Sequence, residues 1–269
     1  MSDRITVTMD GGVADVRLVR ADKMNALDDA MFSALIETGE KLKKDNAVRA
    51  IVLSGEGRAF CAGLDTENFG KMASGERGGE GRLVTPDRTP GGSNRAQHAV
   101  MVWREQQVPV IAAVHGVAFG GGFQLCLGAD MRFVTPDAKL SILEIKWGLV
   151  PDMAGMVLLR GLVRDDIARE LTYSGRVFTG AEAQGLGIAT RVCADPRAEA
   201  LALAAEIASK NPHAVRGAKR LFAAMADGDA KEILKLESKE QTALIGSPNQ
   251  VEAVLSNLQK RAPKFSDVA

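Results

Sequence analysis

The sequence predicts an α/β fold built around a mainly buried sheet. Short apolar segments with the composition of buried strands occur at residues 48–55 (VRAIVLSG), 110–114 (VIAAV) and 131–135 (MRFVT). Helical patterns lie between them, around residues 95–107 and 122–129. Strands that alternate with helices are typical of a sheet whose faces are covered by helices.

The N-terminal part of the chain predicts a hairpin and then a helix. Residues 4–9 and 13–19 alternate between apolar and polar side chains, and Asp10-Gly11-Gly12 separates them, which is a turn signal. The next segment has apolar residues at helical spacing, namely Leu27, Met31, Ala34, Leu35 and Leu42.

Two later segments differ in character. Residues 70–95 contain seven glycines and two prolines and predict a surface loop, either a lid over a site or a tolerated insertion. From residue 196 onward the patterns are helical, which predicts three or four helices. We therefore expect a core at 1–195 and a helical C-terminal region at 196–269, whose apolar faces must be buried on the core or on another subunit.

Composition excludes several classes of protein. The chain has 269 residues, 34 basic and 34 acidic, so its net charge is zero, which argues against a nucleic-acid partner. An apolar content of 46% is that of a folded globular protein. Its three cysteines are too widely spaced for a disulfide framework, and the first residues carry no apolar leader. These features predict a reduced, cytoplasmic protein.

One uncharged segment, residues 108–129, is long enough to cross a bilayer. It contains five glycines, among them the triplet Gly120-Gly121-Gly122, which fits a spanning helix poorly. A buried strand, a glycine turn and a buried helix explain it better, so we expect no membrane partner.

Common catalytic and binding motifs are missing from the sequence. It has no GxxxxGK[ST] phosphate loop, no GxGxxG after a strand and no GxSxG nucleophile elbow. Only three histidines occur, without close ligand spacing, so we expect no metal site.

Two glycine-containing turns are the candidates for chemistry. Residues 55–65 (GEGRAFCAGLD) and 115–124 (HGVAFGGGFQ) each follow a buried strand. Backbone N–H groups from two such turns on neighbouring strands could both point at one oxygen atom and form an oxyanion hole. Alternatively, the glycines only allow strand and helix to pack closely, and spacing alone favours this second interpretation.

The chain resembles the crotonase superfamily of enoyl-CoA hydratases and isomerases. The resemblance rests on segments spread over most of the sequence: MNAL (24–27), RAFCAGLD (58–65), AAVHGVAFGGGFQLCLGADMRF (112–133), LEIKWGLVPDMAG (143–155), TGAEAQGLGIATRV (179–192) and LQKRAPKF (258–265).

The resemblance implies a fold, a substrate class and an assembly. The fold would be a crotonase-type spiral of ββα units with a C-terminal helical trimerisation region, in a homotrimer or hexamer. The substrate would be an acyl-CoA thioester, with no further cofactor because coenzyme A is part of the substrate. The N–H groups of Ala62 and Gly121 would stabilise an enolate oxygen, each contributing about 3–4 kcal/mol to the transition state.

The reaction depends on the acid–base groups near that oxygen. Hydratases of the family have two glutamates, where this chain has Gln124 and Glu144. A neutral amide cannot accept a proton from water, so the set favours double-bond isomerisation by Glu144, whose pKa an apolar pocket would raise. A hydratase using Glu144 and Gln124 remains an alternative, and so does a catalytically weak acyl-CoA-binding paralogue. Glu144 could also be an ordinary surface glutamate.

Asp152 lies eight residues after Glu144, an offset that resembles the dienoyl-CoA isomerases of the family. Asp152 would then be a second proton-transfer group. The dehalogenases of the family also have an aspartate here, but they have tryptophan at the position of Glu144. Asp152 could instead cap a helix at 153–160.

Other residues resemble positions that bind the substrate or support the site. Asp65 is expected to have a structural hydrogen-bonding role as well, Cys61 to pack beneath its turn, and His115 to be structural. The basic tail could reach coenzyme A, across a subunit boundary in some relatives, or could simply be a solvated face. The predicted substrate-binding residues are Met24, Ala26, Gly63, Leu64, Asp65, Gln124, Lys260 and Phe265.

Overall fold

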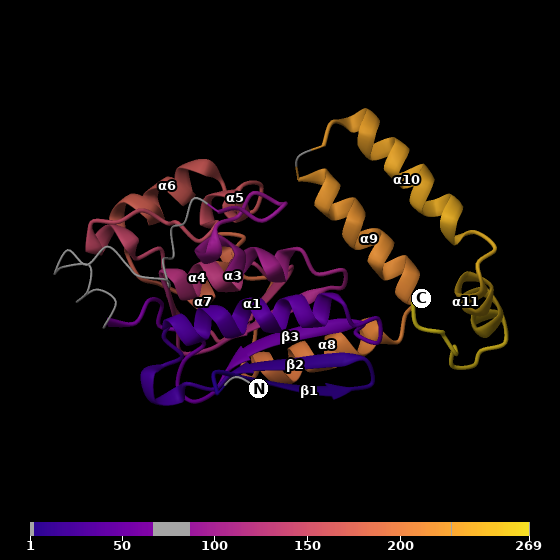
Figure 1. Cartoon of the computed structure of the whole chain (residues 1–269), viewed down its shortest axis with the longest axis horizontal. Helices are drawn as coiled ribbons and strands as arrows, with labels where there is room; N and C mark the ends of the chain where they lie inside the picture. The colour runs from indigo at the N-terminus through magenta and orange to yellow at the C-terminus, as the bar shows by residue number, and fades with distance from the viewer. Residues whose placement is uncertain (1–2, 67–86, 227, 269) are drawn as a thin grey trace.

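The computed structural model describes residues 3–66, 87–226 and 228–268. A mixed sheet lies at its centre, antiparallel at its first pair of strands and parallel at the others (Figure 1). In spatial order the strands are β1 (Ile5–Asp10), β2 (Val13–Leu18), β3 (Ala50–Gly55), β4 (Val110–Val114), β6 (Met131–Val134) and β9 (Arg191–Val192).

The predicted hairpin and strands are confirmed. Gly11 and Gly12 both have positive φ, 53° and 83°, which the tight turn between β1 and β2 requires. The predicted helix begins after Asp28, whose carboxylate accepts a hydrogen bond from Met31 N. This helix is α1 (Asp29–Lys43).

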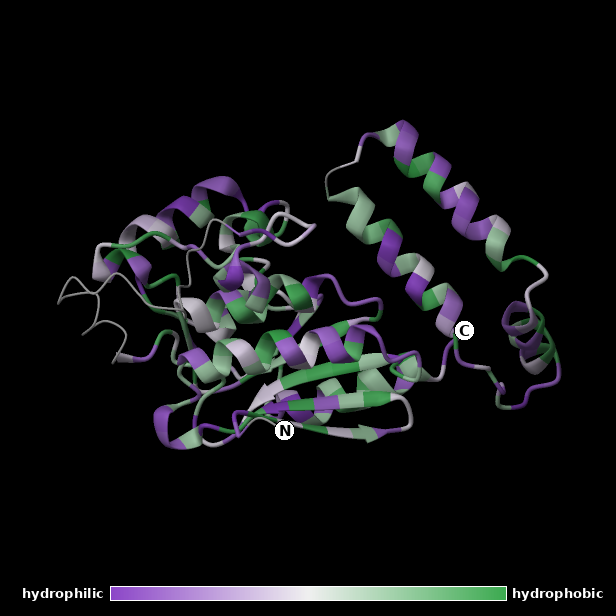
Figure 2. Ribbon diagram, in the orientation of Figure 1, coloured by the Kyte–Doolittle hydropathy of each residue, from purple (hydrophilic) through white to green (hydrophobic). Residues whose placement is uncertain are grey.

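Both faces of the sheet are covered, as the buried strands predict. In β3, Ile51 and Leu53 face the main core, whereas Ala50 and Val52 face the opposite side. The helices α1 and α3 (Arg95–Arg104) belong to the main core, and α8 (Pro196–Ala208) packs on the opposite face against β2, β3, β4 and β6. Figure 2 shows the hydrophobic colouring of the strands at the centre of these layers.

A second, smaller sheet makes the chain spiral. It contains β5 (Val117–Phe119), β7 (Lys139–Ser141) and β8 (Phe178–Thr179). After β3 the chain reaches Cys61, which pairs with Ala118 of β5; β4 leads into β5, and β6 leads into β7. Successive turns therefore lie in register, and the predicted ββα spiral is confirmed.

Short helices connect the turns of the spiral. Residues 108–129, the uncharged segment, form β4, β5 and a helix, as predicted, and no helix in the described ranges is long and apolar enough to span a membrane. The predicted loop at 70–95 lies outside the described residues up to residue 86. The connecting helices are η1 (Ala21–Lys23), α4 (Gly121–Leu127), η2 (Glu144–Trp147), α5 (Gly155–Leu159), α6 (Asp165–Ser174) and α7 (Gly180–Gly185).

The C-terminal region contains four helices in the described residues, of which only α8 covers the sheet. The others form an arm that extends away from the core (Figure 1). Lys219 anchors the arm through its ion pair with Asp130, and Arg216 donates hydrogen bonds to Asn46 O and Val48 O. The arm consists of α9 (Pro212–Met225), α10 (Ala230–Leu244) and α11 (Pro248–Leu258).

Candidate functional site

The two glycine turns meet, as their position after neighbouring strands predicts. Cys61 N donates to Val117 O (3.0 Å), and Phe119 N donates back to Cys61 O (3.2 Å). Gly63 has φ +90°, and a Cβ there would lie 2.5 Å from Phe119 O and 3.6 Å from Gly121 N. Only glycine allows the first turn to approach the start of α4 this closely.

One of the two predicted oxyanion-hole donors is wrong. Ala62 N–H donates to Met24 O (2.9 Å), so this amide is not available to a ligand. Leu64 N–H and Gly121 N–H, by contrast, have no acceptor within the described part of the chain. Gly121 is the first residue of α4, where an N–H has no partner inside its own helix. The adjacent turns therefore offer the amides of Leu64 and Gly121.

The MNAL segment holds the first turn in place. Met24 and Asn25 have positive φ, 49° and 55°, and this conformation turns Met24 O toward Ala62. Leu27 N donates to Gly63 O (2.8 Å), and Asp65 N donates to Leu27 O (3.1 Å). Met24 and Ala26 thus lie beside the turn that carries the free amide of Leu64.

Asp65 stabilises this arrangement through a buried ion pair and is not accessible to substrate. Its carboxylate is 2% exposed and forms an ion pair with Arg20. Arg20 also donates to Ala26 O (3.0 Å) and lies 3.4 Å from the Asp28 carboxylate. The expected structural role of Asp65 is therefore confirmed, and the sequence did not single out its partner Arg20.

Glu144 is buried beside the triple glycine and is not a surface glutamate. It begins η2 and is 8% exposed. A Cβ on Gly120 would lie 3.4 Å from its Oε1, so the carboxyl packs against the backbone that leads into α4. Burial raises the pKa of Glu144, and the nearby charge of Asp152 adds to this increase.

Gln124 makes direct contact with Glu144. Its Nε2 donates to Glu144 Oε1 at 2.6 Å. Its Oε1 accepts hydrogen bonds from Met153 N and Gly155 N, both at 2.9 Å. The other carboxyl oxygen, Glu144 Oε2, is buried and has no hydrogen-bond partner in the described structure.

Asp152 lies on the loop that Gln124 binds. Its side chain reaches solvent, yet enough protein surrounds the carboxyl for desolvation to raise its pKa. The alternative role as a helix cap is wrong: α5 begins after Ala154, and no side chain of its N-cap residue caps it. The structure thus brings Asp152 close enough to Glu144 for their charges to interact.

Exposed apolar residues follow Glu144 closely in the chain, a feature that we did not predict from the sequence. They occur in the sequence LEIKWGLVP, whose run of apolar residues is the signal that could have revealed them. Their exposure is that expected for a surface that contacts an apolar ligand or another protein. They are Ile145, Trp147, Leu149 and Val150.

The structure does not bring the basic tail to this site. Lys260 and Phe265 follow α11, at the far end of the molecule from α4 and α5 (Figure 1). Phe265 O accepts a hydrogen bond from Arg49 at the edge of the core. Within one chain the segment that contains both residues therefore lies apart from Glu144.

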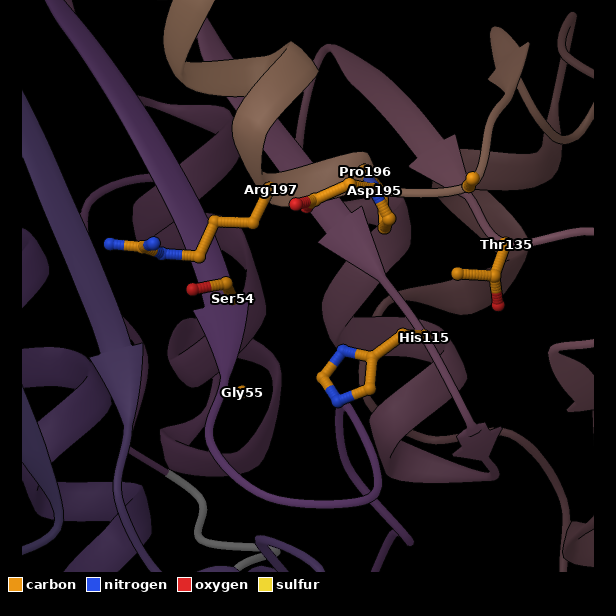
Figure 3. A pocket seen from close by; sticks show the side chains of 8 residues that line it. Ser54, Gly55, His115, Thr135, Asp195, Pro196 and Arg197 are labelled. Atoms are coloured by element: carbon orange, nitrogen blue, oxygen red, sulfur yellow. The ribbon is translucent and has the colours of Figure 1, made fainter.

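A cavity of about 360 Å³ lies elsewhere, at the carboxyl ends of β3, β4 and β6 (Figure 3). It is lined by Ser54, His115, Thr135 and the start of α8. His115 Nε2 lies 2.9 Å from Gly57 O, in line with its expected structural role. The cavity contains none of the predicted catalytic residues.

Two further expectations concern cysteine and metal. Cys61 is buried and its thiol donates to Asn25 O (3.1 Å), while burial raises its pKa to about 12, so it packs beneath the turn as expected. No group of three or more His, Cys, Asp or Glu residues in the described ranges could hold a metal ion.

Comparison with known proteins agrees with this architecture. Residues 8–268 match the family model described as enoyl-CoA hydratase/isomerase. The chain is 31% identical over 259 residues to a mitochondrial Delta(3,5)-Delta(2,4)-dienoyl-CoA isomerase of Mus musculus, covering 94% of this chain and 78% of that protein. It is 31% identical over 265 residues to a probable enoyl-CoA hydratase of Bacillus subtilis (97% and 98% covered). An enoyl-CoA hydratase crystal structure from Mycobacterium smegmatis superposes with a TM-score of 0.81 at 29% identity, covering 97% and 98% of the chains.

Proposed function

Because the chain belongs to the enoyl-CoA hydratase/isomerase family, we propose that this enzyme shifts the double bond of an unsaturated acyl-CoA thioester, with Glu144 as the acid–base group. The observation that carries the proposal is the unpartnered carboxyl oxygen Glu144 Oε2, which lies near two free backbone amides. One group that both removes and returns a proton is what isomerisation needs.

The thioester oxygen would accept hydrogen bonds from Leu64 N–H and Gly121 N–H. Glu144 Oε2 removes a carbon-bound proton; the C–H electron pair forms a new C=C bond, and the carbonyl π electrons move to oxygen. With a 3-enoyl substrate, the electron pair of the original C=C bond takes the proton back from Glu144 at a different carbon when the carbonyl re-forms. The double bond has then moved, and Glu144 is again a carboxylate.

The neighbourhood of Gln124 disfavours hydration. Its amide oxygen already accepts two backbone hydrogen bonds, from Met153 and Gly155, and its nitrogen donates to Glu144. It therefore offers no free acceptor for a proton from water, and a neutral amide is not a base. Glu144 would have to activate the water and protonate the carbon alone.

The position of Asp152 favours a substrate with two conjugated double bonds. A second carboxyl, near enough to influence the pKa of Glu144, can receive or deliver a proton at the far end of a diene. The mouse relative is named a dienoyl-CoA isomerase, which agrees with this arrangement. We therefore favour a 3,5-dienoyl-CoA as the substrate: protonated Asp152 gives its proton to the far carbon, Glu144 keeps the proton that it removed, and exchange with solvent then restores both carboxyl groups.

The test is incubation of the pure enzyme with 2-trans-enoyl-CoA, 3-enoyl-CoA and 3,5-dienoyl-CoA in D₂O, with products analysed by mass. We expect a shifted double bond that contains deuterium, and loss of this product in Glu144→Gln. Addition of one water to the 2-enoyl substrate would establish the hydratase instead. Tight binding of the acyl-CoA without exchange or product would identify a binding paralogue.

We further propose that the arm pairs copies of the chain into a trimer or a hexamer. Large apolar side chains lie exposed on it, and an arm with this much free apolar surface is stabilised by a second copy. In such an assembly Lys260 and Phe265 could reach the site of a neighbouring subunit. The exposed large apolar residues of the arm are Phe222, Met225, Leu234, Ile245, Val251, Val254, Leu255 and Leu258.

A further inference from the structure

We propose that Gln124 is a positioning residue: it fixes one oxygen of Glu144, leaves the other as the sole proton acceptor, and ties the Asp152 loop to the same carboxyl. This inference rests on the proposed role of Glu144 as the acid–base group. It assigns a function to the residue at which the chain departs from the two-glutamate pattern.

The orientation of the Gln124 amide is determined by its neighbours. Two backbone N–H groups, of Met153 and Gly155, point at one end of the amide, each 2.9 Å away. Only the carbonyl oxygen can accept from them, so the NH₂ group must face Glu144. Gln124 is 1% exposed, and therefore water cannot substitute for these partners at low cost.

The contact with Glu144 makes its two oxygens unequal. Oε1 accepts the 2.6 Å hydrogen bond from Gln124, whereas Oε2 is buried without a partner. The hydrogen bond favours the ionised carboxylate and so opposes the increase in pKa that burial causes. Gln124 therefore keeps Glu144 available as a base and directs its reactivity to Oε2.

The same amide holds the loop that precedes α5. Ala154 has φ +68°, a strained conformation for alanine, and it supplies no side-chain cap to the helix. Gln124 Oε1 accepts the N–H groups on both sides of Ala154 and thus replaces the missing cap. A Cβ on Gly155 would lie 2.7 Å from Gln124 Oε1, so glycine is required for this approach.

Two substitutions separate these roles. Gln124→Glu keeps an acceptor for the two N–H groups, but its second oxygen would face Glu144 Oε1 at the present 2.6 Å spacing. Two carboxylates this close must share a proton, which raises the apparent pKa of the pair. Gln124→Met keeps the volume but removes the donor to Glu144 and the acceptor for the loop.

The experiment follows the ¹³C chemical shift of the Glu144 carboxyl by NMR between pH 3 and pH 10, with the signal assigned by comparison with Glu144→Gln. Over the same pH range, kcat and KM are measured with 3,5-dienoyl-CoA. In both Gln124 variants we expect the titration of Glu144 and the acid limb of kcat to move to higher pH. In Gln124→Met we also expect kcat to fall about a hundredfold, with little change in KM.

Gln106→Met is the matched control. Gln106 is also buried, 2% exposed, and its amide donates to Gly39 O and Val102 O away from the site. The Gln106→Met variant should have a lower melting temperature, but its Glu144 should titrate over the same pH range as in the wild type. If Gln124→Glu and Gln124→Met also leave that titration unchanged, the positioning role is wrong. If instead Glu144→Gln still exchanges substrate protons, it is the proposed function that fails, whatever the titration shows.

Discussion

Arg49 and Asp267, which are 218 residues apart, form an ion pair at 2.7 Å that returns the end of the chain to the core. The same guanidinium donates to Ala208 O and Phe265 O, both at 3.2 Å. Arg49 therefore binds the residues on both sides of the arm, namely the end of α8 before it and the tail after α11. This one side chain closes the arm into a loop whose two ends lie together.

Arg49→Ala should release the C-terminal end of the arm without unfolding the core, while Lys219 and Arg216 still anchor α9. Asp267 is 52% exposed, so we expect the ion pair to contribute at most about 1 kcal/mol to global stability. Amide hydrogen exchange should accelerate in α11 and the residues after it and remain unchanged in β2–β4. Uniform acceleration across both regions would show that Arg49 supports the whole fold instead.

Gly63→Ala should remove most of the activity because the free amide of Leu64 depends on that turn. The new Cβ would lie 2.5 Å from Phe119 O, so the turn must move. Loss of one oxyanion donor typically costs about 10²–10³-fold in kcat. Gly161→Ala is the control, because Gly161 also has a positive φ of 74° but open space around it. This variant should keep kcat, while its free energy of unfolding should fall by about 1 kcal/mol.

Ionisation of Glu144 should make the stability of the protein decrease as the pH rises. Because its pKa is raised in the folded state, the folded protein holds this proton at pH values where the unfolded chain has released it. Stability is therefore lost as the pH rises from the unfolded pKa through the folded one. In Glu144→Gln this loss is absent, and the introduced amide oxygen can still accept from Gln124.

Thermal unfolding from pH 4 to pH 9 checks this linkage. The melting temperature of the Glu144→Gln variant should rise relative to that of the wild type as the pH increases, and the difference should level off once Glu144 is ionised. A difference that is constant with pH would contradict the raised pKa.

Asp152→Asn tests the second proton-transfer group. With 3,5-dienoyl-CoA we expect product formation to fall about 10²–10⁴-fold, because no carboxyl remains at the far end of the diene. Exchange of the proton that Glu144 removes should continue in D₂O. Asp165→Asn, at an exposed aspartate paired with Arg169 on α6, should change neither rate. Equal losses of exchange and product would instead assign Asp152 a role in binding.

Much of this architecture could be predicted from sequence, because strand composition and glycine turns act locally. The hairpin at Gly11-Gly12, the buried strands and the meeting of the two turns follow from such signals. Gly121 was predicted as one free amide, but the identity of the other, Leu64, could not be predicted. It depends on the positive φ of Met24, which aims its carbonyl at Ala62 and leaves Leu64 as the donor.

Long-range contacts were equally beyond the sequence pattern. Gln124 was identified as the departure from the two-glutamate pattern, but its hydrogen bonds to Met153 and Gly155 depend on a loop 29 to 31 residues away. The position of Lys260 and Phe265 depends on the direction of the arm. No local signal in LQKRAPKF encodes that direction, since contacts of Arg49, Arg216 and Lys219 with residues far away in the sequence hold the arm in place.

The spiral has a consequence for biosynthesis. Each turn pairs with the turn before it, as Cys61 does with Ala118 and β5 with β7, so each partner has already left the ribosome when the next segment emerges. The core can therefore assemble in the order of translation. The contact between Arg49 and Asp267 cannot form until all three helices of the arm have been made, so we expect this end of the arm to dock after the core has assembled.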